Sequence, residues 1–80
     1  MTIDILLFGI TKDIIGSERY ALELEGDVTV ARLKEALTSE FPQLTKLKSL
    51  LVAVNNKYGQ PETNISSKDE IALIPPVSGG

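Results

Sequence analysis

The last six residues of the chain, PPVSGG, form the segment whose composition is most suited to chemistry. From Ile71 to Gly80 there is no charged side chain, so the only charge is the C-terminal carboxylate, whose ordinary pKa is roughly 3.3–3.7. Gly79 and Gly80 have no Cβ, so this end can enter a narrow channel and adopt backbone angles closed to other residues. We interpret the Gly80 carboxylate as a group that is handled inside another protein's active site.

A carboxylate resists nucleophilic attack because of its resonance and its negative charge, so it must first become an acyl adenylate or a similar mixed anhydride. An acidic neighbour would repel the phosphates of ATP, and a side chain on the last residue would crowd the attacked carbon. This tail has neither. Pro75 and Pro76 hold φ near −65° and give a stiff exit from the preceding strand. Residues 77–80 could reach about 13 Å beyond that exit, since an extended chain spans 3.3 Å or slightly more per residue.

The remaining composition excludes the commoner kinds of active site. The chain has no Cys and no His, which removes disulfides, thiolate metal sites, the usual transition-metal ligands and the usual near-neutral base. It has no glycine-rich phosphate-binding motif and no Ser/His/Asp combination. The closely spaced carboxylates at 23 and 25 and at 69 and 70 fit a solvated surface. We expect a protein that is not an enzyme on its own and binds no cofactor or metal.

Length and charge place the chain among small globular proteins. Its 80 residues correspond to one domain, and 42% apolar with 24% charged residues is an ordinary globular composition. The net charge of −3 argues against nucleic-acid binding. No apolar run approaches the roughly 20 residues that cross a membrane, and Asp4 stands where a secretory signal would have basic residues. We expect a cytoplasmic protein without a membrane partner, made of a domain over 1–75 and a flexible tail over 76–80.

The residues before the tail alternate in the manner of a sheet. Strands are predicted at 2–8, 19–25, 50–55 and 70–74, with a short strand near Tyr58. The first two strands read as a hairpin whose long connection has room for one helical turn. Polar residues around Asn55 and Asn56 indicate a turn.

A helix that begins after Thr29 is the clearest element. Thr29 is a suitable N-cap, and Val28 with Leu33 occupies the positions of a hydrophobic staple. Apolar residues then recur at helical spacing and form one stripe: Leu33, Ala36, Leu37 and Phe41. Pro42 stops the helix. We therefore predict an α+β fold, a mixed sheet with one main helix packed on one face.

A single helix leaves the other face of the sheet open. Alternate residues of the strands are expected to point toward the helix: Ile5, Val52, Val54 and Leu73. The opposite parity would then be exposed: Leu6, Phe8, Leu51, Ala53 and Ile74. An exposed apolar patch of this kind indicates a surface for a partner. The alternatives are an error of parity in one strand, or loops that cover the patch.

Four segments, LLFG near the start, VTVARLKEAL in the helix, VAVN in the middle and DEIALIPPVSGG at the end, together resemble the MoaD-type sulfur carriers. These are the small subunits of molybdopterin synthase and have a ubiquitin-like β-grasp fold. The resemblance covers essentially the whole chain, and the PPVSGG ending is its most specific part. The segment NISSKDE departs from the family's frequent DGDE, which affects a turn and leaves the tail unchanged.

The resemblance implies a role for each residue of the tail. Gly80 would be adenylated by an ATP-using, ubiquitin-activating-type adenylyltransferase and then thiocarboxylated, with a sulfur donor acting through that system. Gly79 would let the tail thread into the large subunit of molybdopterin synthase, in a heterotetramer, where sulfur passes to a pterin precursor. The other tail residues would line the channel of that subunit: Pro75, Pro76, Val77 and Ser78. The docking face would include Phe8, Ile74, Leu6 and Leu51.

Three other interpretations stay open at this point. Carriers of the ThiS type for thiamine thiazole, and carriers for tRNA thiolation or cysteine synthesis, share the fold and the Gly-Gly end, although LIPPVSGG fits the molybdopterin group better. A protein modifier would be joined to lysines through Gly80 and would never carry sulfur. A plain interaction domain would make the Gly-Gly end incidental.

Overall fold

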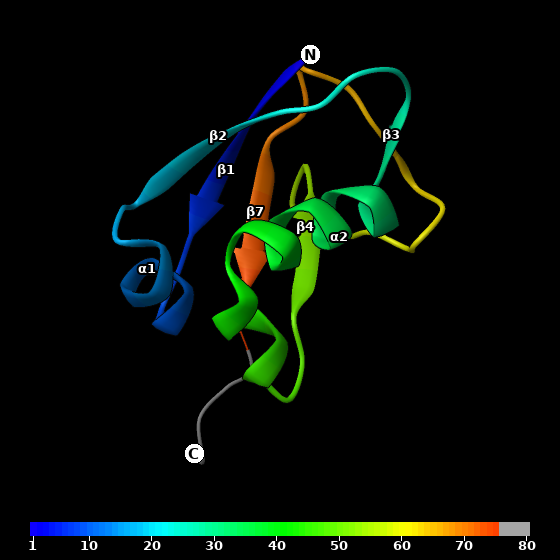
Figure 1. Ribbon diagram of the computed structural model, residues 1–80. Coiled ribbons are helices and arrows are strands. Elements are labelled where there is room, and N and C mark those ends of the chain that lie inside the picture. The colour runs from blue at the N-terminus through cyan, green and yellow to red at the C-terminus, as the bar shows by residue number, and fades with distance from the viewer. Residues whose placement is uncertain (76–80) are drawn as a thin grey trace.

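The computed structural model describes residues 1–75, and the predicted tail over 76–80 lies outside the described residues. The described chain contains β1 (Thr2–Leu7), α1 (Ile10–Ile15), β2 (Arg19–Glu23), β3 (Val28–Thr29), α2 (Val30–Glu40), the 3₁₀ helix η1 (Pro42–Lys46), β4 (Leu51–Val54), β5 (Lys57–Tyr58), β6 (Asn64–Ile65) and β7 (Ile71–Ile74). Figure 1 shows α2 lying across one face of the sheet, with α1 beside the end at which β7 stops.

The main sheet has the strand order β2-β1-β7-β4-β5. β1 and β7 run parallel, with Leu7 beside Leu73, and the other neighbouring pairs are antiparallel. This confirms the predicted mixed sheet. β7 is the last strand of the chain and lies at the centre of the sheet, so the chain leaves the fold from a strand that is paired on both sides.

The core lies between α2 and the face of the sheet that the helix covers. Its strand residues follow the predicted parity, since Ile5, Val52 and Leu73 are all buried. Val54 is only half-buried, because it is next to the turn at the edge of the sheet. Leu33 and Leu37 of α2 are fully buried against these strands, as the apolar stripe predicted.

Three backbone N–H groups at the start of α2 donate to acceptors outside the helix. The Thr29 hydroxyl accepts from the backbone N–H of Arg32 at 3.2 Å, which confirms Thr29 as the N-cap. The N–H groups of Val30 and Ala31 donate to the carbonyls of Thr63 and Pro61, each at 3.0 Å. These bonds use donors that the first turn of a helix leaves without partners, and they hold the loop after β5 against α2.

The structure differs from the sequence prediction in its small elements. The two-residue strands β3 and β6 pair with each other, and such short strands leave no detectable alternation. The connection after β1 contains the six-residue helix α1, where one helical turn was predicted. Pro42 stops α2 as predicted, and it also starts η1, which was not predicted. No helix within residues 1–75 has the length and apolar character needed to span a membrane.

Tyr20 joins the edge strand β2 to the end of α2. Its hydroxyl donates a hydrogen bond to the Glu40 carboxylate, and its ring packs edge-on against Phe41 with ring centroids 5.2 Å apart. The bond to Glu40 holds the hydroxyl in its protonated form and so raises the pKa of Tyr20.

Candidate functional site

The end of β7 is the base of the predicted reactive tail. Ile74 pairs with Leu51 of β4, and one residue earlier Leu73 pairs with Leu7 of β1. Pro75, half-buried, is the last described residue. The other predicted tail residues lie outside the described residues: Pro76, Val77, Ser78, Gly79 and Gly80. Because β7 is paired on both sides, the direction in which the chain leaves the sheet is set by two neighbouring strands.

Gly9 provides the space that Pro75 occupies. Gly9 has φ 54° and ψ −133°, a backbone conformation that residues with a Cβ rarely adopt. A Cβ built on Gly9 would lie 3.2 Å from Cγ of Pro75, closer than an ordinary contact. The sequence predicted a strand that ends at residue 8, just before Gly9, but nothing local indicates a contact between Gly9 and a residue so distant in the chain.

Thr11 fixes the position of Phe8. The Thr11 hydroxyl is fully buried; it donates to the carbonyl of Phe8 at 2.5 Å and accepts from the N–H of Phe8 at 3.1 Å. A second bond runs from the N–H of Thr11 to the same carbonyl at 3.2 Å. The backbone of Phe8 is thus held rigidly although its side chain is 48% exposed. Sequence reasoning missed Thr11, whose role depends on this turn.

The uncovered face of the sheet carries a row of side chains that crosses four strands. The strand register places Leu6, Ala72, Ala53 and Tyr58 in that row. The two alanines are directly opposite each other between larger residues, which leaves a shallow depression of about 320 Å³. Its lining residues are Leu6, Phe8, Ala53, Asn56, Tyr58, Glu70, Ala72 and Ile74.

The structure brings the predicted docking residues together on this face. Phe8 and Leu51 are 48% and 45% exposed, and Leu6 and Ile74 are half-buried by their neighbours. Leu51 does not line the depression but pairs with Ile74 beside it. Tyr58, at 65% exposure, is an additional member that sequence reasoning treated as part of a short strand only. We call this surface, Leu6, Phe8, Leu51, Ala53, Tyr58, Ala72 and Ile74, the open face.

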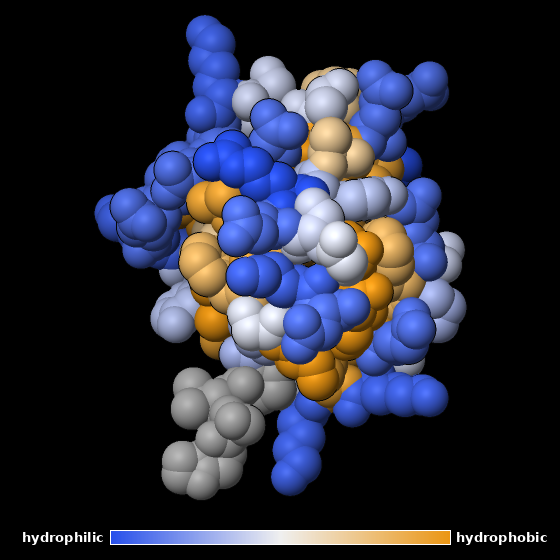
Figure 2. Space-filling model, turned by 90° about the vertical axis from the view of Figure 1, so that its left-hand side faces the viewer, coloured by the Kyte–Doolittle hydropathy of each residue, from blue (hydrophilic) through white to orange (hydrophobic). Residues whose placement is uncertain are grey.

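Charged side chains lie beside the open face, on β1 and β2 and just before β7. Asp4, Arg19 and Glu70 line a small surface hollow next to the start of β7. Figure 2 shows hydrophilic side chains over much of the side that carries β2 and α1, with apolar atoms between them. Ile74 and Leu51 pair at the last residue of β7, so this part of the open face adjoins the point where the chain leaves the fold.

A network around Asn55 fixes the turn before β7. Asn55 donates its N–H to the Glu70 carbonyl and accepts from the Glu70 N–H through its side chain, both at 2.8 Å. The Asn55 side-chain amide and the Ser66 N–H donate to the Asp69 carboxylate at 3.0 and 2.7 Å. The Ser66 bond, followed by that of Asn55, lowers the pKa of Asp69 below its ordinary value. Within residues 1–75 no group of His, Cys, Asp or Glu is arranged to hold a metal ion.

Known proteins of similar length match this chain. The molybdopterin synthase sulfur carrier subunit of Dictyostelium discoideum is 40% identical over 80 residues, which cover 95% of this chain and 93% of that protein. Among solved structures, SAMP1 from Haloferax volcanii is 27% identical with a TM-score of 0.83, and both chains are covered completely. The complex of subunits 1 and 2 of the molybdopterin-converting factor from Helicobacter pylori contains a chain that is 26% identical with a TM-score of 0.66, again with complete coverage.

These likenesses confirm the predicted ubiquitin-like β-grasp fold. The profile of the ThiS family matches residues 5–80, so the match extends from β1 through the Gly-Gly end. The match covers nearly the whole chain, and by it the protein belongs to the ThiS family.

Proposed function

We propose that this protein is a sulfur carrier and the small subunit of a molybdopterin synthase, and that it carries the sulfur on Gly80. The observation that carries the proposal is the placement of Pro75. The residue that leads into the Gly-Gly end leaves the central strand beside an exposed apolar surface. The full-length likeness to the Dictyostelium discoideum carrier subunit supports the choice of client.

The chemistry takes place at the carboxyl carbon of Gly80. Adenylation joins a carboxylate oxygen to the α-phosphorus of ATP and releases pyrophosphate, which gives the acyl carbon a good leaving group. A sulfur nucleophile at the oxidation level of hydrosulfide then attacks that carbon and displaces AMP, leaving a thiocarboxylate. The carrier binds no ATP itself in this scheme; the nucleotide belongs to the activating adenylyltransferase.

The open face acts as the docking surface for both partners in turn. The adenylyltransferase and the large synthase subunit must each receive the same tail, and the open face adjoins its base. Phe8, Leu51 and Tyr58 are exposed anchors on a sheet held rigidly from behind by α2. A complex of subunits 1 and 2 is known for the molybdopterin-converting factor of Helicobacter pylori. For this chain we propose a heterotetramer of two carriers and two large subunits, acting in the cytoplasm, where ATP is available.

Intact-mass spectrometry tests the carrier chemistry directly. The protein is incubated with ATP, the candidate adenylyltransferase and a sulfur donor. The expected product is heavier by the replacement of one oxygen with sulfur, and fragmentation places the change on Gly80. A variant that lacks Gly80 should show no change, and so should the complete mixture without ATP. An unchanged mass with an adenylyltransferase that is active on another carrier would contradict the proposal.

The client is tested by reconstitution with the large subunit. The thiocarboxylated protein should convert the pterin precursor to molybdopterin in a single turnover, and the variant without Gly80 should not. Failure of this step after successful thiocarboxylation would leave a sulfur carrier with another client, such as thiazole formation or tRNA thiolation.

A second candidate function is protein modification through Gly80. The likeness to SAMP1, whose structure has also been described as small archaeal modifier protein 1, favours it. In that case the adenylate would pass to a lysine amine and form an isopeptide bond without sulfur in the product. Peptide mapping of proteins that become linked to the tagged carrier distinguishes the two functions, since only a modifier leaves its C-terminal tryptic peptide, residues 69–80, on lysines.

A further inference from the structure

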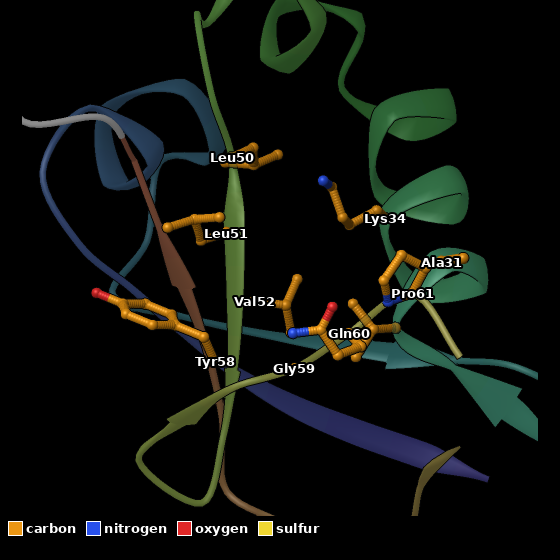
Figure 3. Close-up of a pocket in the computed structure, with 10 residues that line it drawn as sticks. Ala31, Lys34, Leu50, Leu51, Val52, Tyr58, Gly59, Gln60 and Pro61 are labelled. Carbon is orange, nitrogen blue, oxygen red and sulfur yellow. The ribbon is translucent and has the colours of Figure 1, made fainter. Parts of the chain in front are cut away.

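A second surface lies behind the open face, in the space between α2 and the first half of β4. It is a groove of about 580 Å³. Its helix side is formed by Val30, Ala31 and Lys34, and its strand side by Leu50 and Val52. Figure 3 shows Lys34 reaching from α2 toward β4 across this space, with Gly59, Gln60 and Pro61 at one end. Apart from Lys34, the side chains of the groove are uncharged.

The groove exists because β5 covers only half of β4. β5 pairs with Ala53 and Val54, and the Gly59 N–H donates to the Val52 carbonyl at 2.8 Å. The chain then leaves the strand and runs to the start of α2. At Gly59 it passes so close to the helix that a Cβ would lie 2.8 Å from Cγ2 of Val30. The place beyond this bond, beside Leu50 and Leu51, where a longer β5 would lie, is therefore not filled by the described chain.

The edge of β4 at this place presents free backbone groups. Asn55 exchanges a hydrogen bond with Glu70 of the β7 side, and the antiparallel ladder alternates, so the backbone groups of Leu51 also face β7. Those of Leu50 and Val52 consequently face the groove side. The Val52 carbonyl there already accepts from Gly59, so the groups left for a partner are the Val52 N–H and the backbone groups of Leu50. Within residues 1–75 no acceptor bonds the N–H of Val52. An unpaired strand edge of this kind is a template for another extended chain.

The two sides of β4 would supply alternating contacts for an added strand. Figure 3 shows Leu51 and Tyr58 on the side of β4 opposite to α2, and Lys34 and Ala31 on the other side. An extended peptide turns successive side chains to opposite faces. One set would enter the groove beside Ala31 and Val52, and the other would extend the open face beside Leu51 and Tyr58.

Charge indicates what kind of peptide fits. Lys34 is half-buried and forms no ion pair within residues 1–75. The segment 41–61, which supplies β4 and β5, contains three lysines and no acidic residue, whereas the other 59 residues contain five basic and eleven acidic side chains, a net charge of −6. The β4 side is thus a positively charged region of an acidic protein. A carboxylate on the bound strand would satisfy the Lys34 amine.

We propose that the free edge of β4 binds an extended acidic-apolar segment of a partner protein as an added strand, with one carboxylate of that segment on Lys34. This interaction does not involve the Gly80 carboxylate. If the peptide did not bind at β4, the proposed sulfur chemistry would be unaffected. If Gly80 carried no sulfur, the proposed binding at β4 would be unaffected.

The probe is a blocked peptide of alternating composition, acetyl-Glu-Val-Asp-Val-Asp-Ile-Glu-amide, titrated into the ¹⁵N-labelled full chain. We expect shift changes concentrated at the amides of Leu50, Leu51, Val52 and Gly59, and slower hydrogen exchange at Val52 in the complex. A second peptide replaces the four acids by lysine, and a third has N-methylated alternate amides that cannot donate to the edge. Both should bind at least about fivefold more weakly. The lysine peptide lacks a carboxylate for Lys34, and the N-methylated peptide lacks backbone N–H donors for the strand edge.

Two variants locate the site. Lys34→Gln should weaken the acidic peptide about fivefold, whereas Arg32→Gln, the same loss of charge two residues away and outside the groove lining, should leave the affinity within about twofold. Ala31→Gln fills the groove from an exposed helical position and should abolish binding, with folding verified by its own amide spectrum. The proposal is overturned if the acidic and lysine peptides bind equally, if the shifts lie on β2 or only in the depression of the open face, or if no shift appears at millimolar peptide.

Discussion

The variant Phe8→Ala tests two quantities separately: the unfolding free energy of this protein, and the affinity of its open face for a partner. The Phe8 side chain is 48% exposed in the free protein. About half of its surface therefore stabilises the fold, and about half remains available to a partner. Fully burying a Phe contributes about 1.5–3 kcal/mol, so the variant should lose about 1 kcal/mol of unfolding free energy.

The effect on docking follows from the same exposed fraction. An aromatic side chain has about 200 Å² of surface to bury, so about 100 Å² of Phe8 is left for the partner. At about 25 cal/mol per Å² this corresponds to about 2.5 kcal/mol, or about 60-fold in Kd. Thr11 holds the Phe8 backbone in place, so little backbone entropy is lost when the ring is covered.

The assay is the dissociation constant of the complex with the cognate large synthase subunit, measured by isothermal titration, together with urea unfolding of the free carrier. Ile10→Ala is the matched control, since Ile10 is also 48% exposed but does not line the depression. It should change the affinity less than about threefold. A Phe8→Ala carrier that binds as tightly as the parent, or an Ile10→Ala carrier that loses equally much, would refute the assignment of the open face as the docking surface.

The remaining predictions concern the fold that holds the tail base. Gly9→Ala and Gly26→Ala both place a Cβ at positive φ, 54° and 74°, but only the first meets a neighbour, Cγ of Pro75 at 3.2 Å. In urea unfolding Gly26→Ala should lose about 1 kcal/mol and Gly9→Ala about 1–2 kcal/mol more, and equal losses would mean that the Pro75 contact carries no energy. Leu37→Ala should cost about 2–5 kcal/mol because Leu37 is 0% exposed, while Leu51→Ala, at 45% exposure, should cost about 1 kcal/mol; similar losses would contradict the placement of the core. The pKa of Asp69 is lowered on folding, so the stability due to its carboxylate is present above its ordinary pKa of 3.8 and is lost as the pH falls through the lower folded value. Unfolding midpoints of Asp69→Asn should therefore depend less on pH than those of the parent in this acid range, and parallel profiles would show that the Ser66 and Asn55 bonds do not stabilise the charge.

Much of the fold could be predicted because its signals are local or periodic. The Thr29 cap depends on an N–H three residues away, and the parity of Ile5, Val52 and Leu73 follows from the two-residue period of a strand. The turn at Asn55 and Asn56 could also be predicted, since both residues adopt the positive φ that asparagine tolerates. The pairing of β3 with β6 could not, because two residues carry no period.

The sequence by itself indicated the proposed reactive group, the Gly80 carboxylate. The two glycines, the two prolines and the absence of charged side chains are properties of neighbouring residues in the chain, so they indicate an activatable carboxylate without any knowledge of the fold. The tertiary structure alone decided what surrounds the base of that tail. The register of distant strands places Ala53 opposite Ala72 and makes a depression, and the return of the chain puts Pro75 on Gly9. The departure of the chain from β4 at Gly59 leaves the strand edge free beside Lys34. Such contacts join residues far apart in sequence, and only the long-range pairing of strands brings them within reach of one another.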